Sequence, residues 1–179
     1  MFKIEDTLLL VVDFQVNLMP AIHNHNELEK KTVTFINGCR LLDMPILTMQ
    51  QYSKGLGDTI PAIKAALGEF QHIEKTTFSC YGDAGFVTKL KETGKTNIIV
   101  TGIEAHICVQ QTVLDLLDNG YNVYVVADCI GSRNETDRLY AEKRMQQAGA
   151  IITTLESVLF ELLLRAEHPM RKEISKLVQ

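Results

Sequence analysis

Short apolar runs alternate with segments of helical periodicity along nearly the whole chain, and this alternation limits the fold more than any other feature. Six runs predict strands, at residues 8–12, 45–49, 71–75, 97–102, 122–128 and 150–154. Apolar residues at helical spacing predict helices at residues 28–42, at the end of 54–67, and at 84–92, 109–119, 138–148, 155–163 and 170–178. Runs such as LLLVV are continuously apolar, which is typical of parallel strands that helices cover on both faces. The chain is therefore predicted to be an α/β protein with a six-stranded parallel sheet.

The order of the predicted strands follows from the rules for connections. Right-handed crossovers between parallel strands leave few arrangements, and we expect the doubly wound order 3-2-1-4-5-6 in a three-layer α/β/α sandwich. Strands 1 and 4 are neighbours in this order, so a ligand site is expected in the crevice at their carboxyl ends. A length of 179 residues suits a single domain over residues 1–179.

Three polar residues stand at predicted carboxyl ends of strands. Asp13 follows the first strand, Lys75 ends the third, and Cys108 follows the fourth in the opening turns of a helix. A helix N-terminus stabilises a thiolate, and its N–H groups can hold an oxyanion. A nearby carboxylate can accept the thiol proton, and a lysine ammonium can hold that carboxylate in place. Together these residues indicate nucleophilic catalysis by Cys108.

Each of the three residues also has an ordinary structural interpretation. Cys108 could be a small buried hydrophobe, Asp13 a helix-capping residue and Lys75 a solvated lysine at a strand end. Only their joint placement favours catalysis. The remaining cysteines form no C-x-x-C motif and are expected to be free core thiols; they are Cys39, Cys80 and Cys129.

Charge and hydropathy narrow the classes of function. A net charge of −4 and a pI near 5.7 argue against nucleic acid as the main partner, and no basic run suggests a membrane surface. No apolar stretch approaches the roughly 18 residues needed to span a bilayer. The opening MFKIEDTLLLVVDF is typical of a strand and not of a signal peptide. We therefore expect a cytoplasmic protein. We also expect it to act on a small molecule and to use no cofactor.

Three blocks of sequence carry a family resemblance: VVDFQVNLM, EKTTFSCY and TGIEAHICVQQTVLDLLDNGYNVYVVADCIGSR. They resemble the isochorismatase-like cysteine hydrolases, and GIEAHICV is most similar to the isochorismatase domain-containing branch. The resemblance implies a Rossmann-like sandwich with Asp13 as general base, Lys75 as orienting cation and Cys108 as nucleophile. It also implies a cis peptide bond between Ile103 and Glu104, which would aim the backbone N–H groups of Glu104 and Cys108 at an oxyanion. The implied reaction is hydrolysis of an amide-like substrate through a thioester.

Departures from the family pattern narrow the implied chemistry. Isochorismatases proper cleave a vinyl ether and do not need the cysteine, so the presence of Cys108 indicates an amide or a related C–N bond. Nicotinamidases of the family hold a metal with an aspartate and histidines after strand 2, whereas QQYSKGLGD has no histidine here, and we expect no metal. His23 and His25 do not complete a metal site by themselves and are expected to lie in a polar loop before a helix.

Segments around the three site residues also supply candidate pocket residues. An apolar wall with a few polar groups would suit a small substrate, and each of these residues could equally serve ordinary packing; for His106 the structural role is the stronger interpretation. The candidates are Phe14, Gln15, Gln51, Tyr52, Phe78, Tyr81 and His106.

Two other classes of function stay open at the level of sequence. One is a catalytically silent interaction protein that keeps the fold, and the other is a thiol sensor that uses Cys108 without turnover. The C-terminal segment LESVLFELLLRAEHPMRKEISKLV is rich in leucine and could pack on the sheet or on a second subunit. Because members of the resembled family are commonly oligomers, we expect a homo-oligomer.

Overall fold

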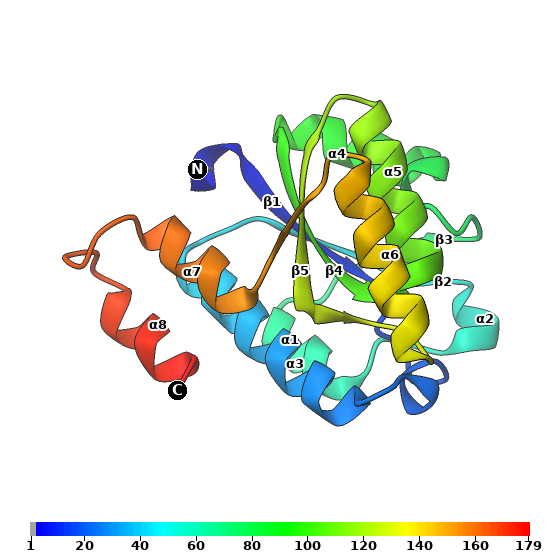
Figure 1. The fold of residues 1–179 in the computed structure, drawn as a ribbon, viewed down its shortest axis with the longest axis horizontal. Helices are drawn as coiled ribbons and strands as arrows, with labels where there is room; N and C mark the ends of the chain where they lie inside the picture. Colours follow the sequence, from blue (N-terminus) through cyan, green and yellow to red (C-terminus); the bar gives the residue numbers. More distant parts are fainter. Residues whose placement is uncertain (1–2) are drawn as a thin grey trace.

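Six parallel strands form a single sheet in the computed structural model, which describes residues 3–179 (Figure 1). Their order is β3-β2-β1-β4-β5-β6, which confirms the predicted arrangement. The strands are β1 Thr7–Val12, β2 Ile46–Gln51, β3 Ile73–Lys75, β4 Asn97–Ile103, β5 Asn122–Gly131 and β6 Ile151–Thr153. The central strands β1 and β4 pair from Thr7 opposite Asn97 to Val12 opposite Gly102, so their carboxyl ends lie side by side.

Helices cover both faces of this sheet (Figure 1). The helices of the described chain are α1 His25–Leu41, α2 Ser53–Leu56, α3 Pro61–Leu67, α4 Ala84–Thr93, α5 Gln110–Asp118, α6 Glu135–Gln147, α7 Leu155–Leu163 and α8 Arg171–Leu177, and all but the short α2 contribute to the apolar layers on the two faces. Within residues 3–179, no helix has both the length and the apolar content needed to cross a bilayer.

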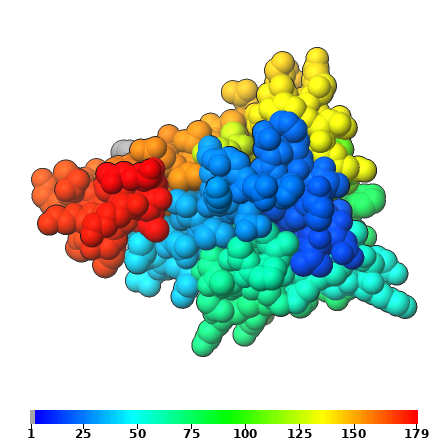
Figure 2. Space-filling view, turned by 90° about the horizontal axis from the view of Figure 1, so that it is seen from below, coloured from blue at the N-terminus to red at the C-terminus, as the bar shows by residue number. Residues whose placement is uncertain are grey.

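Two apolar layers form because successive side chains of a strand point to opposite faces of the sheet. In β1, Leu9 and Val11 pack with α1, α3 and α7, whereas Leu8, Leu10 and Val12 pack with α4, α5 and α6. Burial on both faces explains why β1 is a continuous apolar run. The leucine-rich C-terminal segment joins the first layer, and Figure 2 shows its end, in red, beside α1.

Several element boundaries differ from the sequence prediction, among them those of α1, which begins at His25, and of α6, β5 and β3. Helix α6 begins at Glu135 and not at residue 138, because its first turn carries acidic residues that suit a helix N-terminus but add nothing to the apolar periodicity. Strand β5 continues beyond residue 128 to Gly131. Strand β3 is shorter than predicted and covers only Ile73–Lys75.

The connection after β4 contains a π-helical turn, Ala105–Val109, labelled η4, and α5 begins only at Gln110. Cys108 therefore lies within the π turn and not in the first turn of an α-helix. The N–H groups of Ile107 and Val109 both donate to the Glu104 carbonyl oxygen, at 3.0 and 3.3 Å. Single π-helical turns are frequent at functional sites.

Candidate active site

Asp13 and Lys75 form a buried ion pair at the carboxyl edge of the sheet. Lys75 Nζ lies 2.8 Å from Asp13 Oδ2, and both side chains are 0% exposed. Lys75 ends β3 and Asp13 follows β1, so the lysine reaches across the end of β2, which lies between them. The ammonium also donates to Gln51 Oε1 at 2.6 Å and to the Thr77 carbonyl oxygen at 3.3 Å. Its three donors thus have three acceptors, as a buried ammonium requires.

Cys108, in the turn that follows β4, lies next to this ion pair. Its Sγ lies 3.9 Å from Gln51 Oε1, the same oxygen that accepts from Lys75. Asp13 Oδ1 is buried without a hydrogen-bond partner among the residues that the structure describes, and the carboxylate interacts electrostatically with the Cys108 thiol. The structure therefore brings together the three side chains that the predicted topology placed at one edge.

Burial and neighbouring charges set the protonation of the three groups. Burial, followed by the negative charge of Asp13, raises the pKa of Cys108 well above its usual range, so the resting thiol is protonated at neutral pH. Burial also raises the pKa of Asp13, against the lowering influence of Lys75. Burial lowers the pKa of Lys75, but the negative charge of Asp13 and the hydrogen bond to it oppose this effect, and the pKa ends above its usual value. Asp13 is thus a stronger base than an exposed aspartate, which suits acceptance of a thiol proton.

The backbone turns sharply where β1 ends. Asp13 has a φ of 56°, in the left-handed region that aspartate tolerates better than most residues. Its N–H donates to the Met49 carbonyl oxygen at 3.2 Å, and its own carbonyl oxygen accepts from the Gln15 N–H at 2.7 Å. The carboxylate is therefore held on a hydrogen-bonded turn at the strand end.

Thr112 anchors the π turn that carries Cys108. Its hydroxyl donates to the Cys108 carbonyl oxygen at 2.6 Å and accepts from the Cys80 N–H at 2.9 Å. This buried hydroxyl ties the segment after β3, which follows Lys75, to the segment after β4.

Glu104 is held on the other side of the same turn. Its Oε2 accepts from Arg133 Nε at 3.0 Å and from the Arg133 N–H at 3.3 Å. The peptide bond between Ile103 and Glu104 is cis, as the family resemblance implied.

Comparison with known proteins assigns the family. A model of the isochorismatase domain matches residues 7–157, which include Asp13, Lys75 and Cys108. The chain belongs to the isochorismatase family. Isochorismatase domain-containing protein 2 of Danio rerio is 38% identical over 173 residues, which cover 96% of this chain and 86% of the relative. The resemblance seen in the sequence is therefore confirmed.

Solved structures of the isochorismatase fold superpose closely on this chain. The MAR1 ribonuclease of Caenorhabditis elegans has a TM-score of 0.92 and 40% sequence identity, covering 99% of this chain and 91% of that one. The YcaC gene product of Escherichia coli is described as an octameric hydrolase of unknown specificity. It has a TM-score of 0.89 and 26% sequence identity, and the match covers 98% of this chain and 86% of the relative. These relatives support an isochorismatase-like hydrolase domain in general.

The candidate pocket residues of this isochorismatase domain fall into different environments. Gln51 contacts both the Lys75 ammonium and the Cys108 sulfur. Gln15 is fully buried and hydrogen-bonds the backbone of Gln51. Phe14 is also buried and packs in the apolar layer beside α1. Of these, only Gln51 contacts a member of the Asp13–Lys75–Cys108 set through its side chain.

The other candidates lie farther toward solvent. Tyr52 and Phe78 are 49% and 56% exposed. Tyr81 is half-buried and packs edge-on against Tyr121, with ring centroids 6.3 Å apart. His106 Nδ1 lies 2.9 Å from Ser132 Oγ, which fits the structural role favoured from the sequence.

The donor set for the metal of family nicotinamidases does not fit here. Within residues 3–179 no cluster of three or more His, Cys, Asp or Glu side chains could hold a metal ion. Asp58, the aspartate that follows β2, is engaged by the Lys64 ammonium, by Gln50 Nε2 at 2.6 Å and by the Thr59 N–H at 2.8 Å.

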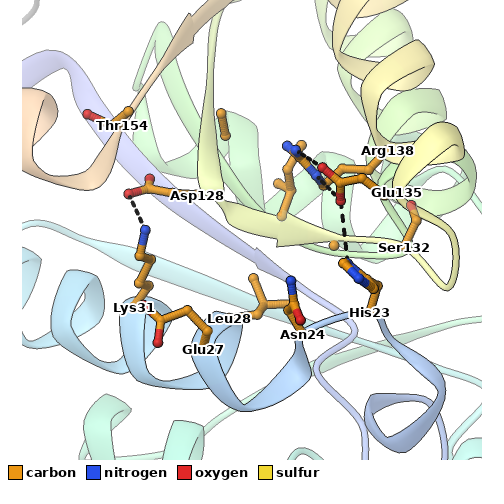
Figure 3. A pocket seen from close by; sticks show the side chains of 13 residues that line it. His23, Asn24, Glu27, Leu28, Lys31, Asp128, Ser132, Glu135, Arg138 and Thr154 are labelled. Atoms are coloured by element: carbon orange, nitrogen blue, oxygen red, sulfur yellow. Dashed lines mark hydrogen bonds and ion pairs between the residues drawn. The ribbon is translucent and has the colours of Figure 1, made fainter.

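His23 lines a pocket of about 300 Å³ between α1, the end of β5 and the start of α6 (Figure 3), and none of Asp13, Lys75 and Cys108 lines this pocket. His23 Nδ1 lies 3.6 Å from Glu135 Oε2 at one side of this pocket, and Lys31 Nζ lies 3.6 Å from Asp128 Oδ2 at the other. His25 is the first residue of α1. The ring of His23 therefore faces the Glu135 carboxylate, which Arg138 also engages through Nε and Nη2.

Sequence reasoning missed two residues that hold the site. Thr112 stands four residues after Cys108, the spacing at which a threonine hydroxyl reaches back to a helical carbonyl oxygen, and this was its only signal. Arg133 carried no signal, because its partner Glu104 lies on a different strand end.

Proposed function

We propose that this protein is a metal-independent cysteine hydrolase that cleaves a small amide or a related C–N bond through a thioester on Cys108. The main support is the convergence of Asp13, Lys75 and Cys108 at one sheet edge, with the Asp13–Lys75 pair 2.8 Å apart and fully buried. A buried ion pair adds little stability over apolar packing. Its presence beside a cysteine therefore favours a chemical role.

The proposed reaction uses each group in turn. Asp13 Oδ1 accepts the thiol proton as the substrate arrives, and Cys108 Sγ forms a bond to the carbonyl carbon. The N–H groups of Glu104 and Cys108 hold the oxyanion. The C–N bond then breaks, and Asp13 returns its proton to the departing amine or ammonia.

Hydrolysis of the thioester completes the cycle. Asp13 takes a proton from water, the hydroxide adds to the acyl carbon, and the C–S bond breaks to give the carboxylic acid. The sulfur recovers its proton, and Lys75 holds the Asp13 carboxylate in place throughout.

Acyl trapping tests this proposal. The protein is incubated with a panel of small primary and secondary amides and quenched in acid, and the peptide that contains Cys108 is examined by mass spectrometry. We expect an acyl group on Cys108 together with released ammonia or amine. Cys108→Ala should fold and lose hydrolysis, whereas Cys129→Ala, a buried cysteine in the opposite apolar layer, should retain it. Hydrolysis by Cys108→Ala would overturn the proposal.

The same measurements separate the alternatives. A thiol sensor would show a reactive Cys108 without turnover, and an interaction protein would show neither. The C. elegans relative is described as a ribonuclease, but the net charge of −4 of this chain gives no support for an RNA substrate.

We also propose that the chain forms a homo-oligomer. The E. coli relative is described as octameric. In this chain, Ile151 on edge strand β6 is 52% exposed, and Phe160 and Leu164 at α7 are 40% and 65% exposed. Large apolar side chains of this kind are commonly covered at subunit interfaces.

A further inference from the structure

The carboxamide of Gln51 joins the lysine of the site to its cysteine. Gln51 is the last residue of β2, between the ends of β3 and β1. Its Oε1 accepts from Lys75 Nζ at 2.6 Å and lies 3.9 Å from Cys108 Sγ, within reach of the thiol hydrogen. One neutral oxygen therefore contacts both the cation and the nucleophile of the proposed reaction.

The structure holds this carboxamide rigidly. Gln51 Nε2 donates to the Thr76 carbonyl oxygen at 3.0 Å, so the oxygen and not the amide nitrogen faces Lys75. The Gln51 backbone is held by fully buried Gln15, whose Oε1 accepts from the Gln51 N–H at 2.7 Å and whose Nε2 donates to the Gln51 carbonyl oxygen at 2.9 Å. The second Gln15 amide hydrogen reaches the Gly57 carbonyl oxygen at 2.7 Å. A residue with all its polar groups satisfied has little freedom to move.

We propose that Gln51 is a positioning residue of this site, which fixes the Lys75 ammonium against Asp13 and receives the thiol hydrogen of Cys108 at rest. The inference rests on the proposed cysteine chemistry and deepens it. A neutral amide oxygen can accept from both donors without placing a charge beside the sulfur. A carboxylate at this position would compete with Asp13 for Lys75 and oppose formation of the thiolate. The site therefore needs a neutral acceptor at residue 51.

Alkylation of Cys108 by iodoacetamide tests whether residue 51 must be neutral, and it requires no substrate. The rate constant at Cys108 is measured by peptide mass spectrometry between pH 6.5 and pH 9.5, for the wild type and for Gln51→Glu. We expect Gln51→Glu to react at least about tenfold more slowly at each pH, because a negative charge in place of an oxygen 3.9 Å from the sulfur opposes the thiolate.

Gln50→Glu is the matched control. Gln50 is the preceding residue of β2 and is also buried, but its amide donates to Asp58 and Thr59 and not to the site. We expect its alkylation profile to stay within about threefold of the wild type, since its side chain points to the other face of the sheet.

The outcomes are distinct. A wild-type profile in folded Gln51→Glu, or an equal slowing in Gln50→Glu, would overturn the inference. If Gln51→Glu does not fold, Gln51→Asn withdraws the oxygen by one methylene, and a change of more than about threefold in the Cys108 rate is expected; an unchanged rate would overturn the inference. A shifted profile in a protein that hydrolyses no amide would refute the proposed function and leave this role of Gln51 standing.

Discussion

At the scale of single residues, the buried Asp13–Lys75 pair couples stability to pH. Replacing Lys75 with Met would leave the Asp13 carboxylate buried without its cation, and we expect a loss of about 3–5 kcal/mol in the free energy of unfolding near pH 8. Burial already raises the pKa of Asp13 above its ordinary value of 3.8, and Lys75 is its main lowering influence, so the variant raises this pKa further.

The raised pKa of Asp13 sets the sign of the pH dependence of stability. A carboxyl whose folded-state pKa is raised contributes stability below its unfolded pKa and loses it as pH rises through the folded value. Urea unfolding of Lys75→Met should therefore show a smaller loss at pH 5 than at pH 8. The double variant Asp13→Asn/Lys75→Met should lose less than Lys75→Met alone, and a loss independent of pH would contradict this account.

The cysteines should differ in their reactivity. Cys39, Cys80 and Cys129 are 0% exposed and Cys108 is 6% exposed, so iodoacetamide should modify Cys108 first. Because burial and Asp13 raise the pKa of Cys108, its alkylation rate should still climb about tenfold per pH unit between pH 7 and pH 9. Peptide mapping over time checks both points, and a plateau in the rate below pH 7.5 would show a depressed pKa instead.

At the scale of elements, the Thr112 hydroxyl links the segment that follows β3 to the segment that follows β4. Thr112→Val keeps the shape of the side chain but leaves the Cys80 N–H without its acceptor and removes the bond to the Cys108 carbonyl oxygen. We expect a loss of about 1–3 kcal/mol in the free energy of unfolding, measured with urea. Thr112→Ser retains the hydroxyl and should lose clearly less; equal losses in the two variants would assign the effect to packing.

The elements of the fold and of the candidate site were predictable from the sequence to different degrees. The central strands were predictable because burial on both faces makes them apolar. Strand order placed Asp13, Lys75 and Cys108 at one edge of the sheet, but only the structure shows that their side chains lie close together. The π turn at Ala105–Val109 was not predictable, because its residues show no periodicity that separates it from an α-helix. Gln51 could be named from the sequence as a candidate pocket residue, but only the structure shows which way its amide points, and the role proposed for it depends on that orientation.

At the scale of the whole molecule, the end of α7 exposes a large apolar side chain that a second subunit would cover. Leu164 is 65% exposed and has a φ of 61°, a backbone region that leucine rarely adopts. Asparagine is polar and adopts a positive φ more readily than leucine does, so we expect Leu164→Asn to leave the folded subunit intact. If a second copy covers this residue, the substitution should weaken assembly at least about tenfold.

Sedimentation velocity between about 0.5 and 50 µM tests this expectation. The wild type should sediment at a multiple of 20.1 kDa, and Leu164→Asn should shift toward the single-chain mass with an unchanged circular dichroism spectrum. Leu139→Asn, at another exposed leucine on α6, is the control and should assemble as the wild type does. A wild type that sediments at 20.1 kDa throughout would refute the oligomer, and an oligomer unaffected by Leu164→Asn would place its interface away from the end of α7.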